Sequence, residues 1–483
     1  MTKKQKLALI YGISGLFILI NAIFIANEFF WFMAIPLIGF LILMYFTSLD
    51  KVLLLITFLT PLSITLSNYE AQLGLALPTE PLMVGVLVLY LYKLFFDQAY
   101  DIKIIRHPVT ISILFYLSWM LLTSITSEMP LVSFKFFIAK LWFIVPFFFL
   151  ATQLFKNIKT FKIFSWMYII SLCIVIIYTS IRHSFYAFNE EVGHWVMEPF
   201  YNDHTAYGGM IAFFIPVIFG FLFDKSYSNT QRFFTLNAAI ILLIGLYLSY
   251  CRAAWLALTI AIGLALIVKL RIKIKWVVLA GILFIGLFFM LRSEIIMKLE
   301  KNKQDASENF VQHIQSMSNI STDASNLERI NRWDAAFRMF KDRPFWGFGP
   351  GTYQFCYAPY QYSYVQTIIS TNAGNRGNAH SEYIGPLAET GVLGLLSVLA
   401  IAITVIYTAL KVYWKSKNKK TKLLIFIALL SLTTYYIHGF LNNFLDTDKA
   451  SVPFWGFIAM IVALDVYHLR NEKSEDNQQI DIQ

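Results

Sequence analysis

Charged residues are scarce in this chain: aspartate, glutamate, lysine and arginine make up 14% of its 483 residues, against about a quarter in a soluble domain. Hydrophobic residues make up 58%, and this imbalance excludes a soluble globular enzyme with one exposed apolar patch. Cysteine is also rare, with Cys173, Cys251 and Cys356 in the whole sequence. A disulfide-rich secreted scaffold is therefore excluded, although a single bridge between Cys251 and Cys356 is left open.

Aromatic side chains and long apolar runs are abundant instead. Phenylalanine, tyrosine and tryptophan make up 17% of the chain, which suits helices packed in lipid with rings near the membrane interfaces. The net charge of +10 does not indicate nucleic-acid binding, because most basic residues fall in short loops between apolar runs, where they set orientation. The first apolar run, 7–26, is long enough to span a membrane and lacks a signal-peptide cleavage site.

The apolar runs predict an all-α polytopic membrane protein with about 12–14 transmembrane helices, since each span needs about 20 mostly apolar residues. One short run, 51–67, is interrupted by Pro61. Fourteen spans can be counted, near 7–26, 29–46, 51–67, 81–96, 109–127, 137–154, 161–181, 205–223, 233–250, 252–268, 276–292, 390–412, 423–440 and 452–467.

The distribution of basic residues predicts the orientation. With the N-terminus in the cytoplasm, the inside segments hold 23 Lys and Arg residues and the short outside segments hold 4, as the positive-inside rule requires. Residues 1–292 then form helices 1 to 11, and 293–383 form one large loop on the periplasmic side of a bacterial inner membrane. Residues 384–467 form helices 12 to 14, and 468–483 form a polar cytoplasmic tail that is expected to be disordered.

The large loop carries a predicted helix. Ser325 and Glu328 form a capping box, and apolar residues at helical spacing follow over 326–342. Pro344 then ends the helix, and the glycines of 347–351 predict a tight turn. Arg329 and Arg332 lie one turn apart near the start of this helix, where they form a candidate anion site. The alternative is a solvated face with two ordinary arginines.

Two further positions can carry chemistry. Arg252 lies where the apolar runs 233–250 and 252–268 meet with almost no loop, and an arginine held at membrane depth is a functional candidate, although it can also snorkel to water. His380 lies just before the run 390–412 on the predicted outer side. Its imidazole can take a proton near neutral pH, with Glu382 or Glu389 as the orienting group.

His204, next to Asp203, is a second histidine candidate on the same predicted side. For both histidines, the alternative is an ordinary exterior residue without a catalytic part.

Taken in order, five fragments form a recognisable pattern. It resembles the signature of the O-antigen ligase and polymerase superfamily, bacterial membrane glycosyltransferases that act on undecaprenyl-linked glycans. The resemblance covers residues 200–400. The fragments are Cys251-Arg252-Ala-Ala-Trp255, Arg329-x-x-x-Trp333, Pro344-Phe-Trp-Gly347-Phe-Gly349-Pro-Gly351, Asn378-Ala-His380-Ser-Glu382-Tyr and Glu389-Thr-Gly391-Val-Leu-Gly394.

The resemblance implies a role for each matching position. Arg252 and Arg329 would grip the pyrophosphate of an undecaprenyl-pyrophosphate-linked glycan donor, and His380 would activate the acceptor hydroxyl. Cys251 departs from the family, which more often has serine there. Arg332 is an extra basic residue, so which helix arginine is essential stays open. The implied substrate-binding residues are Arg332, Trp255, Trp333, Asn378, Glu382 and Glu389.

No metal or cofactor is expected. A pyrophosphate leaving group needs its developing charge neutralised, and arginine does this without a metal. The first predicted outer segments contain Glu28, Glu70 and Glu80 but no convincing acidic pair for a divalent ion.

The acceptor is left open between a second glycan, lipid A-core and a protein hydroxyl. Two other classes compete with the glycosyltransferase. A lipid-linked-saccharide flippase would need ionisable groups along a midplane path, whereas the candidates cluster at one face. A scaffold subunit would not need an arginine pair with a histidine.

Overall fold

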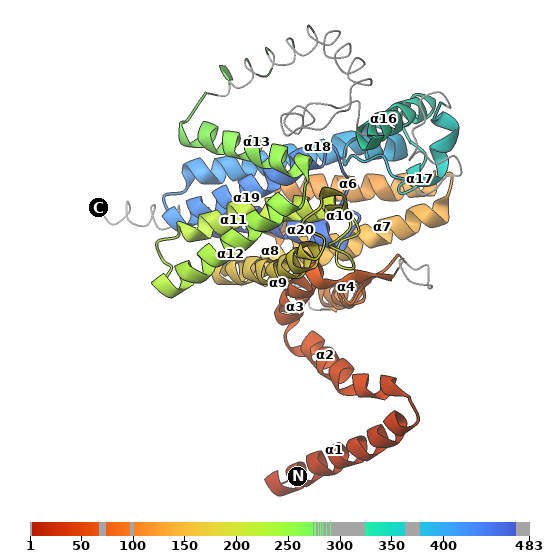
Figure 1. Ribbon diagram of the computed structural model, residues 1–483, viewed down its shortest axis with the longest axis vertical. Coiled ribbons are helices and arrows are strands. Elements are labelled where there is room, and N and C mark those ends of the chain that lie inside the picture. Colours follow the sequence, from red (N-terminus) through yellow and green to blue (C-terminus); the bar gives the residue numbers. More distant parts are fainter. Residues whose placement is uncertain are drawn as a thin grey trace.

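The computed structural model describes residues 2–66, 74–96, 101–273, 324–362 and 377–469, with isolated positions between 275 and 290. The described part is a bundle of long helices (Figure 1), and the predicted all-α polytopic membrane class is confirmed. Among the described residues, 11 helices are long and apolar enough to cross a membrane. They are α1 (Lys3–Ala26), α4 (Thr79–Phe96), α6 (Pro108–Ile125), α7–η4–α8 (Pro130–Leu154), α9 (Ile158–Ser184), α11 (His204–Leu222), α12 (Asn229–Leu248), α13 (Arg252–Lys269), α18 (Ile384–Lys415), α19 (Lys419–His438) and α20–η7 (Asp448–Leu469).

Shorter elements connect these helices. Two of the long spans contain a π-helical stretch, η4 (Val145–Leu150) and η7 (Leu464–Leu469), and one small antiparallel ladder pairs β1 (Ile64–Thr65) with β2 (Ala76–Leu77). The remaining elements are η1 (Phe30–Ala34), α2 (Ile35–Thr47), α3 (Leu49–Leu59), η2 (Thr60–Leu62), α5 (Ile102–Ile105), α10 (Glu190–Gly193), α16 (Ala324–Asp342), α17 (Tyr353–Cys356) and η5 (Ala358–Tyr360).

Three of the fourteen predicted spans differ from the structure or lie beyond it. The run 29–46 corresponds to a shorter apolar helix, Phe32–Thr47. The run 51–67 is not one helix, because α3 ends at Leu59 and gives way to η2 and β1. Pro61 accounts for this, since proline removes a backbone donor and clashes with the preceding turn. Most of the run 276–292 lies outside the described residues.

The broken backbone at η2 is satisfied by buried charged residues at the start of α20. Lys449 Nζ donates to the carbonyl oxygens of Thr60 (2.6 Å) and Ser63 (2.7 Å). The neighbouring Asp448 Oδ2 accepts from Ser63 Oγ (2.5 Å) and Thr79 Oγ1 (2.6 Å). Irregular backbone at membrane depth is tolerated where protein groups replace the missing hydrogen bonds. Lys449 therefore fastens the interrupted helix to the centre of the bundle.

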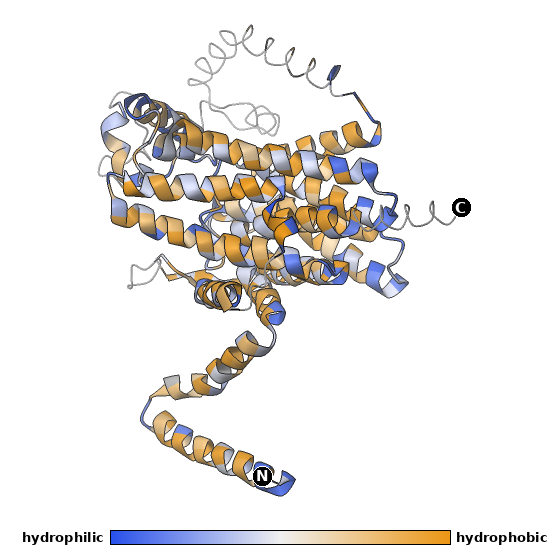
Figure 2. Ribbon diagram, turned by 180° about the vertical axis from the view of Figure 1, so that it is seen from behind, coloured by the Kyte–Doolittle hydropathy of each residue, from blue (hydrophilic) through white to orange (hydrophobic). Residues whose placement is uncertain are grey.

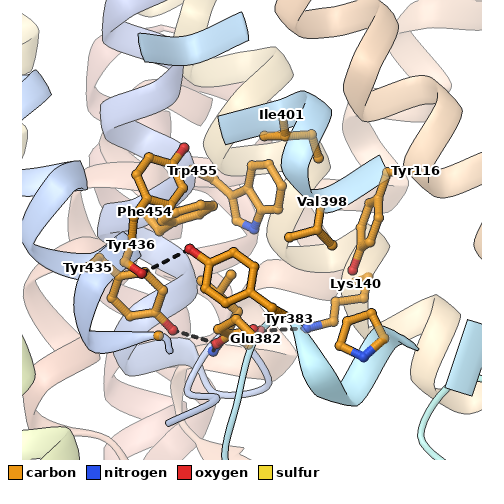
Figure 3. A pocket seen from close by; sticks show the side chains of 13 residues that line it. Tyr116, Lys140, Glu382, Tyr383, Val398, Ile401, Tyr435, Tyr436, Phe454 and Trp455 are labelled. Carbon is orange, nitrogen blue, oxygen red and sulfur yellow. Dashed lines mark hydrogen bonds between the residues drawn. The ribbon is translucent and has the colours of Figure 1, made fainter. Parts of the chain in front are cut away.

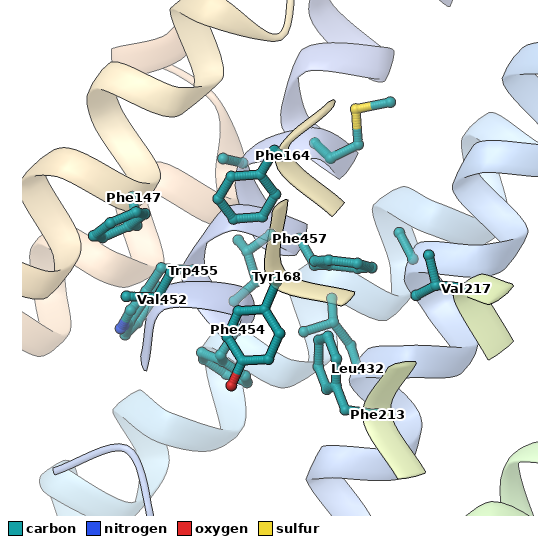
Figure 4. Packing of buried hydrophobic residues seen from close by; sticks show 14 of the residues in the cluster. Phe147, Phe164, Tyr168, Phe213, Val217, Leu432, Val452, Phe454, Trp455 and Phe457 are labelled. Atoms are coloured by element: carbon teal, nitrogen blue, oxygen red, sulfur yellow. The ribbon is translucent and has the colours of Figure 1, made fainter. Parts of the chain in front are cut away.

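Helix α20 forms that centre, with 94% of its spanning window buried inside the protein. Figure 4 shows Phe457 of α20 among aromatic rings of the surrounding helices. Its ring centroid lies 4.9 Å from Phe213 of α11 and 5.2 Å from Phe161 of α9. Gly456 permits this approach, since a Cβ there would lie 2.4 Å from the Phe164 ring. Small residues at helix contacts serve this purpose in membrane bundles.

Helices α1 and α2 extend away from the bundle (Figure 1), and α1 has no buried residue. Hydrophobic residues cover the lengths of the bundle helices, while hydrophilic residues gather towards the two ends of the bundle (Figure 2). This distribution is typical of a membrane-spanning bundle.

Helix α16 packs at one end of the bundle, against the start of α18. We call this end the α16 end; the starts of α11 and α13 and the end of α19 also lie there. The predicted helix 326–342 is confirmed as α16. Of the two residues in its predicted capping box, the side chain of Glu328 is described and that of Ser325 lies outside the described part.

The predicted tight turn at 347–351, which we call the glycine turn, is confirmed. Gly347, Gly349 and Gly351 all have positive φ angles, of 66°, 114° and 73°, a region that favours glycine. The turn is tied to α18 by Phe348 N–H to Ala388 O (3.2 Å) and Gly349 N–H to Glu389 O (2.7 Å). Inside α18, Gly391 leaves the helical conformation (φ 70°, ψ −167°), and a Cβ there would lie 2.1 Å from the carbonyl oxygen of Phe345. The glycines thus let the chain that follows α16 bond to α18 through its backbone.

Candidate functional site

Glycines bring the starts of α11 and α13 into contact at the α16 end. Helix α12 ends at Leu248 and α13 begins at Arg252, and Tyr250 in the reversal has φ 50°. Cys251 is buried against α11, where a Cβ on Gly208 would lie 2.6 Å from the Cβ of Cys251. Cys251 and Cys356 are both free thiols, so the bridge that the sequence left open is not formed. Burial raises the pKa of the Cys251 thiol to about 12.

Arg332 is a buried structural link. Its side chain is 7% exposed, and Nε lies 2.8 Å from Glu328 Oε1. Its Nη1 donates to the carbonyl oxygen of Asn378 (3.0 Å), and its guanidinium lies over the Tyr357 ring at 5.4 Å. These contacts hold the segment 377–383 against α16, so the guanidinium of Arg332 is committed to protein groups.

Arg329 lies one turn earlier on α16 and is half-buried. Its charge acts on three groups from other elements, namely His380, Cys251 and His438. Arg329 is therefore close to the junction of α11, α13 and α19, where it adds positive charge.

His380 has a strained backbone and an uncharged ring. Its φ is 47°, and its N–H donates to Asn378 Oδ1 (3.0 Å). Burial lowers the pKa of His380 to about 4, and the charges of Arg332 and Arg329 lower it further, against the opposing effect of Asp203 and Glu328. The imidazole is consequently neutral at physiological pH, the state in which one ring nitrogen can accept a proton. Non-glycine residues with positive φ are a recurrent feature of functional sites.

The other predicted histidine, His204, belongs to a cluster at the start of α11. Asp203 caps this helix, with Oδ1 accepting from Thr205 N–H (2.8 Å). His204 Nδ1 lies 3.2 Å from Asp203 Oδ1, and its ring stacks on His194 with centroids 4.3 Å apart. Although burial opposes it, hydrogen bonds from His204 and Thr205 hold the pKa of Asp203 well below its usual range. Asp203 therefore stays ionised beside the site.

One histidine at this candidate site was not predicted from the sequence. His438 closes α19, is 1% exposed, and packs so near α11 that a Cβ on Gly209 would lie 2.8 Å from its Nε2. Asn442 Nδ2 lies 3.3 Å from the same nitrogen. The signal was available, since an ionisable residue at the end of a membrane span is a default functional candidate.

The two glutamates predicted to orient His380 have other partners. Glu382 Oε1 accepts from Tyr435 Oη (2.6 Å) and Leu445 N–H (2.9 Å). Burial and the nearby Asp446 raise the pKa of Glu382 to about 7. Glu389 accepts from the backbone N–H groups of Gly351 (2.9 Å) and Tyr353 (3.0 Å). Glu389 therefore shapes the glycine turn, and Glu382 fixes the loop after α19.

The remaining predicted site residues differ in how far their side chains are exposed. Arg252 is exposed at the first position of α13, and Trp255 lies one turn later with 42% of its surface exposed. Asn378 is exposed and Trp333 is half-buried on α16. The structure thus brings Arg329, His380 and the unpredicted His438 to one junction, with Arg252 at its edge. Among the described residues, no group of three or more His, Cys, Asp or Glu has a metal-binding arrangement.

These features define a multi-pass α-helical membrane protein with a candidate site of arginine and histidine side chains at one end of its bundle. Residues 237–399 match the family model of O-antigen ligase, which confirms the resemblance seen in the motifs and covers Arg252, Arg329 and His380. This family comprises membrane proteins that transfer glycosyl groups. An uncharacterized protein of Haemophilus influenzae is 23% identical over 256 residues, 52% of this chain. The matched region spans 61% of that relative's length.

Proposed function

We propose that the protein is a glycosyltransferase of the periplasmic face of the bacterial inner membrane. It transfers or polymerises a glycan from an undecaprenyl-pyrophosphate donor onto a hydroxyl acceptor. The observation that carries the proposal is that Arg329, from α16, lies near enough to His380, from the segment before α18, for its charge to lower the pKa of that histidine. The basic residues of the loops support the orientation, since the predicted inside segments hold 23 Lys and Arg residues and the short outside segments hold 4.

The chemistry needs a base on one side of the sugar and positive charge on the other. In the transfer step, His380 takes the proton of the acceptor hydroxyl, and the hydroxyl oxygen forms a bond to the anomeric carbon. The bond from that carbon to the donor phosphate breaks, and undecaprenyl pyrophosphate leaves with the electron pair. Arg329 and Arg252 stabilise the charge that develops on this leaving group. Preorganised donors aimed at developing charge typically contribute about 10²–10³-fold each.

The positive charge comes from arginine in this proposal, so the reaction is independent of metal. Transfer by the purified protein should persist in excess chelator. Complete loss of transfer in chelator, restored by manganese or magnesium, would contradict the proposal and make Asp203, His204 and Glu382 the candidate ligands.

The proposal is tested by deleting the gene and analysing surface glycans. Loss of chain length with single repeats retained indicates a polymerase, and loss of all attachment to lipid A-core indicates a ligase. Unglycosylated secreted proteins indicate a protein-directed transferase. Wild-type protein should restore the glycan and His380→Ala should fail to do so at equal expression. Unchanged surface glycans in the deletion strain would refute the proposal.

A further inference from the structure

A polar cavity lies beside the segment that carries His380 and is not used by the transfer chemistry above. It has a volume of about 190 Å³ and adjoins a smaller one of about 50 Å³, drawn in Figure 3. Both are lined by Tyr116 of α6, Lys140 of α7, and Glu382 and Pro386 at the start of α18. We call the two together the Lys140 cavity.

A buried ammonium group forms the floor of the Lys140 cavity. Lys140 Nζ donates to Asp446 Oδ1 (2.7 Å) and to Leu445 O (2.8 Å). The Lys140 side chain is 6% exposed, whereas that of Asp446 is 40% exposed. The ion pair therefore runs from the depth of the cavity to its mouth. Burying a charge is costly unless it is paired, and Asp446 supplies the partner of this lysine.

The Lys140 cavity is rich in carboxyl groups, whereas the neighbouring site is rich in arginine. Its lining contains three carboxyl groups, Glu382, Glu389 and Asp446, and one ammonium group. A pyrophosphate would be repelled here, whereas Arg329 and Arg332 lie near His380. Charged sites of opposite sign select different ligands. The two sides of the segment 377–383 therefore suit different ligands. The side of Arg329 suits an anionic ligand, and the Lys140 cavity suits an uncharged one.

Neutral hydrogen-bonding groups and rings complete the lining. The side chains of Gln354, Asn378 and Asn443 offer amide donors and acceptors, and Phe136 and Tyr353 contribute aromatic walls. Carboxylates and amides bond readily to hydroxyl groups, and a cavity with few placed polar groups on an apolar wall is the usual form of a small-ligand site. The volume suits one sugar ring rather than an extended chain.

We propose that the Lys140 cavity binds a neutral sugar of the acceptor and thereby presents its hydroxyl to His380. This inference rests on the proposed function and adds to it the class of acceptor, a saccharide rather than a protein side chain. Four residues of the segment, Asn378, Ala379, Ser381 and Glu382, line the cavity, and these four flank His380 in the sequence. Lys140 and Asp446 are positioned to select the sugar by its hydroxyl pattern.

The test uses the full-length protein in lipid nanodiscs with donor lipid purified from the deletion strain. The acceptor probes are the free repeat oligosaccharide released from that lipid by mild acid, a lipopolysaccharide core, and a serine-containing peptide. Gln354→Ala and Asn443→Ala should each raise the KM for the sugar acceptor about three- to tenfold, as expected for one lost hydrogen bond. The KM for donor should not change. Asn237→Ala, an exposed amide on α12, is the matched control.

A filling variant gives an independent readout. Asn443→Phe should block transfer to the sugar probes while inorganic pyrophosphate still raises the thermal midpoint of the protein as it does for wild type. Unchanged acceptor KM in all cavity variants, or wild-type transfer to the peptide alone, would overturn the inference and leave the glycosyltransferase standing. Wild-type transfer to none of the three probes would instead count against the proposed function.

Discussion

Arg329 and Arg332 lie one turn apart on α16, and their surroundings assign them different tasks. Arg332 is enclosed by Glu328, the Asn378 carbonyl and the Tyr357 ring, whereas Arg329 is half-buried and its charge acts on groups of α13 and α19. A guanidinium bound on several sides has few donors left for a substrate. These surroundings favour Arg329 as the helix arginine in the proposed contact with the donor.

The first prediction separates binding from structure at these two positions. Arg329→Ala should lower transfer by about 10²–10³-fold with an unchanged thermal midpoint. Arg332→Ala should lower the thermal midpoint, because it leaves the buried Glu328 carboxylate unpaired, which costs about 3–5 kcal/mol. The double variant Glu328→Gln with Arg332→Gln should regain part of that stability. Lys341→Ala, on the same helix and exposed, is the control, and full activity of Arg329→Ala would remove the leaving-group role.

The second prediction concerns the acid limb of the pH profile. A general base must be unprotonated, and the lowered pKa of His380, about 4, keeps it so until the pH falls to that value. The ratio kcat/KM reports the free enzyme, so it should hold from pH 7 down to about 5 and fall near 4. An ordinary histidine would already lose half its activity near pH 6.5. Such an early loss in the wild type would contradict the environment described for His380.

Glu382 lines the Lys140 cavity, and burial together with the nearby Asp446 raises its pKa to about 7. A change in rate between pH 6 and 8 that is present in the wild type and absent in Glu382→Gln is therefore assigned to the Lys140 cavity. The acid limb near 4 should persist in this variant, because it belongs to His380.

The interruption of the helix at η2 leads to the third prediction. Lys449→Met should lower the thermal midpoint of the protein, because the carbonyl groups of Thr60 and Ser63 lose their buried donor. Each buried group left unsatisfied costs about 1–3 kcal/mol. Activity per folded molecule should stay near wild type. Lys135→Met, on the exposed surface of α7, is the matched control, and equal stability of the two variants would show that Lys449 does not hold the break.

Elements with strong local signals were predictable from the sequence, and contacts between distant elements were not. Helical spacing before Pro344 gave α16 to within two residues, and the glycines of 347–351 gave the turn. The partners of Glu389, in contrast, lie 36 and 38 positions away in the sequence. No local pattern shows that this carboxylate binds a turn rather than a histidine. His438 was missed because it was read as part of an apolar run.

For the whole molecule, the orientation of the bundle is a fourth prediction. Residues 293–383 should lie outside the cell membrane and 411–422 inside, from the difference of 23 against 4 basic residues. In a variant with its three cysteines replaced, a cysteine at Ser318 should react with an impermeant reagent in cells with a permeabilised outer membrane. A cysteine at Lys417, the matched control, should react only after lysis. The reverse pattern would overturn the orientation and the function built on it.

The backbone hydrogen bonds between the glycine turn and α18 bear on how the proposed transferase would use the binding energy of its substrates. His380 and Arg329 are held on one frame, in which Phe348 and Gly349 bond to α18 and Arg332 bonds to the chain before His380. Their separation is thus set by the folded chain rather than by a closing movement of these parts. A centre assembled in advance does not draw on ligand affinity to form, and what remains is available to align the reacting atoms. The slow step of each turnover would then be the lateral diffusion of the lipid-linked donor through the bilayer to the site.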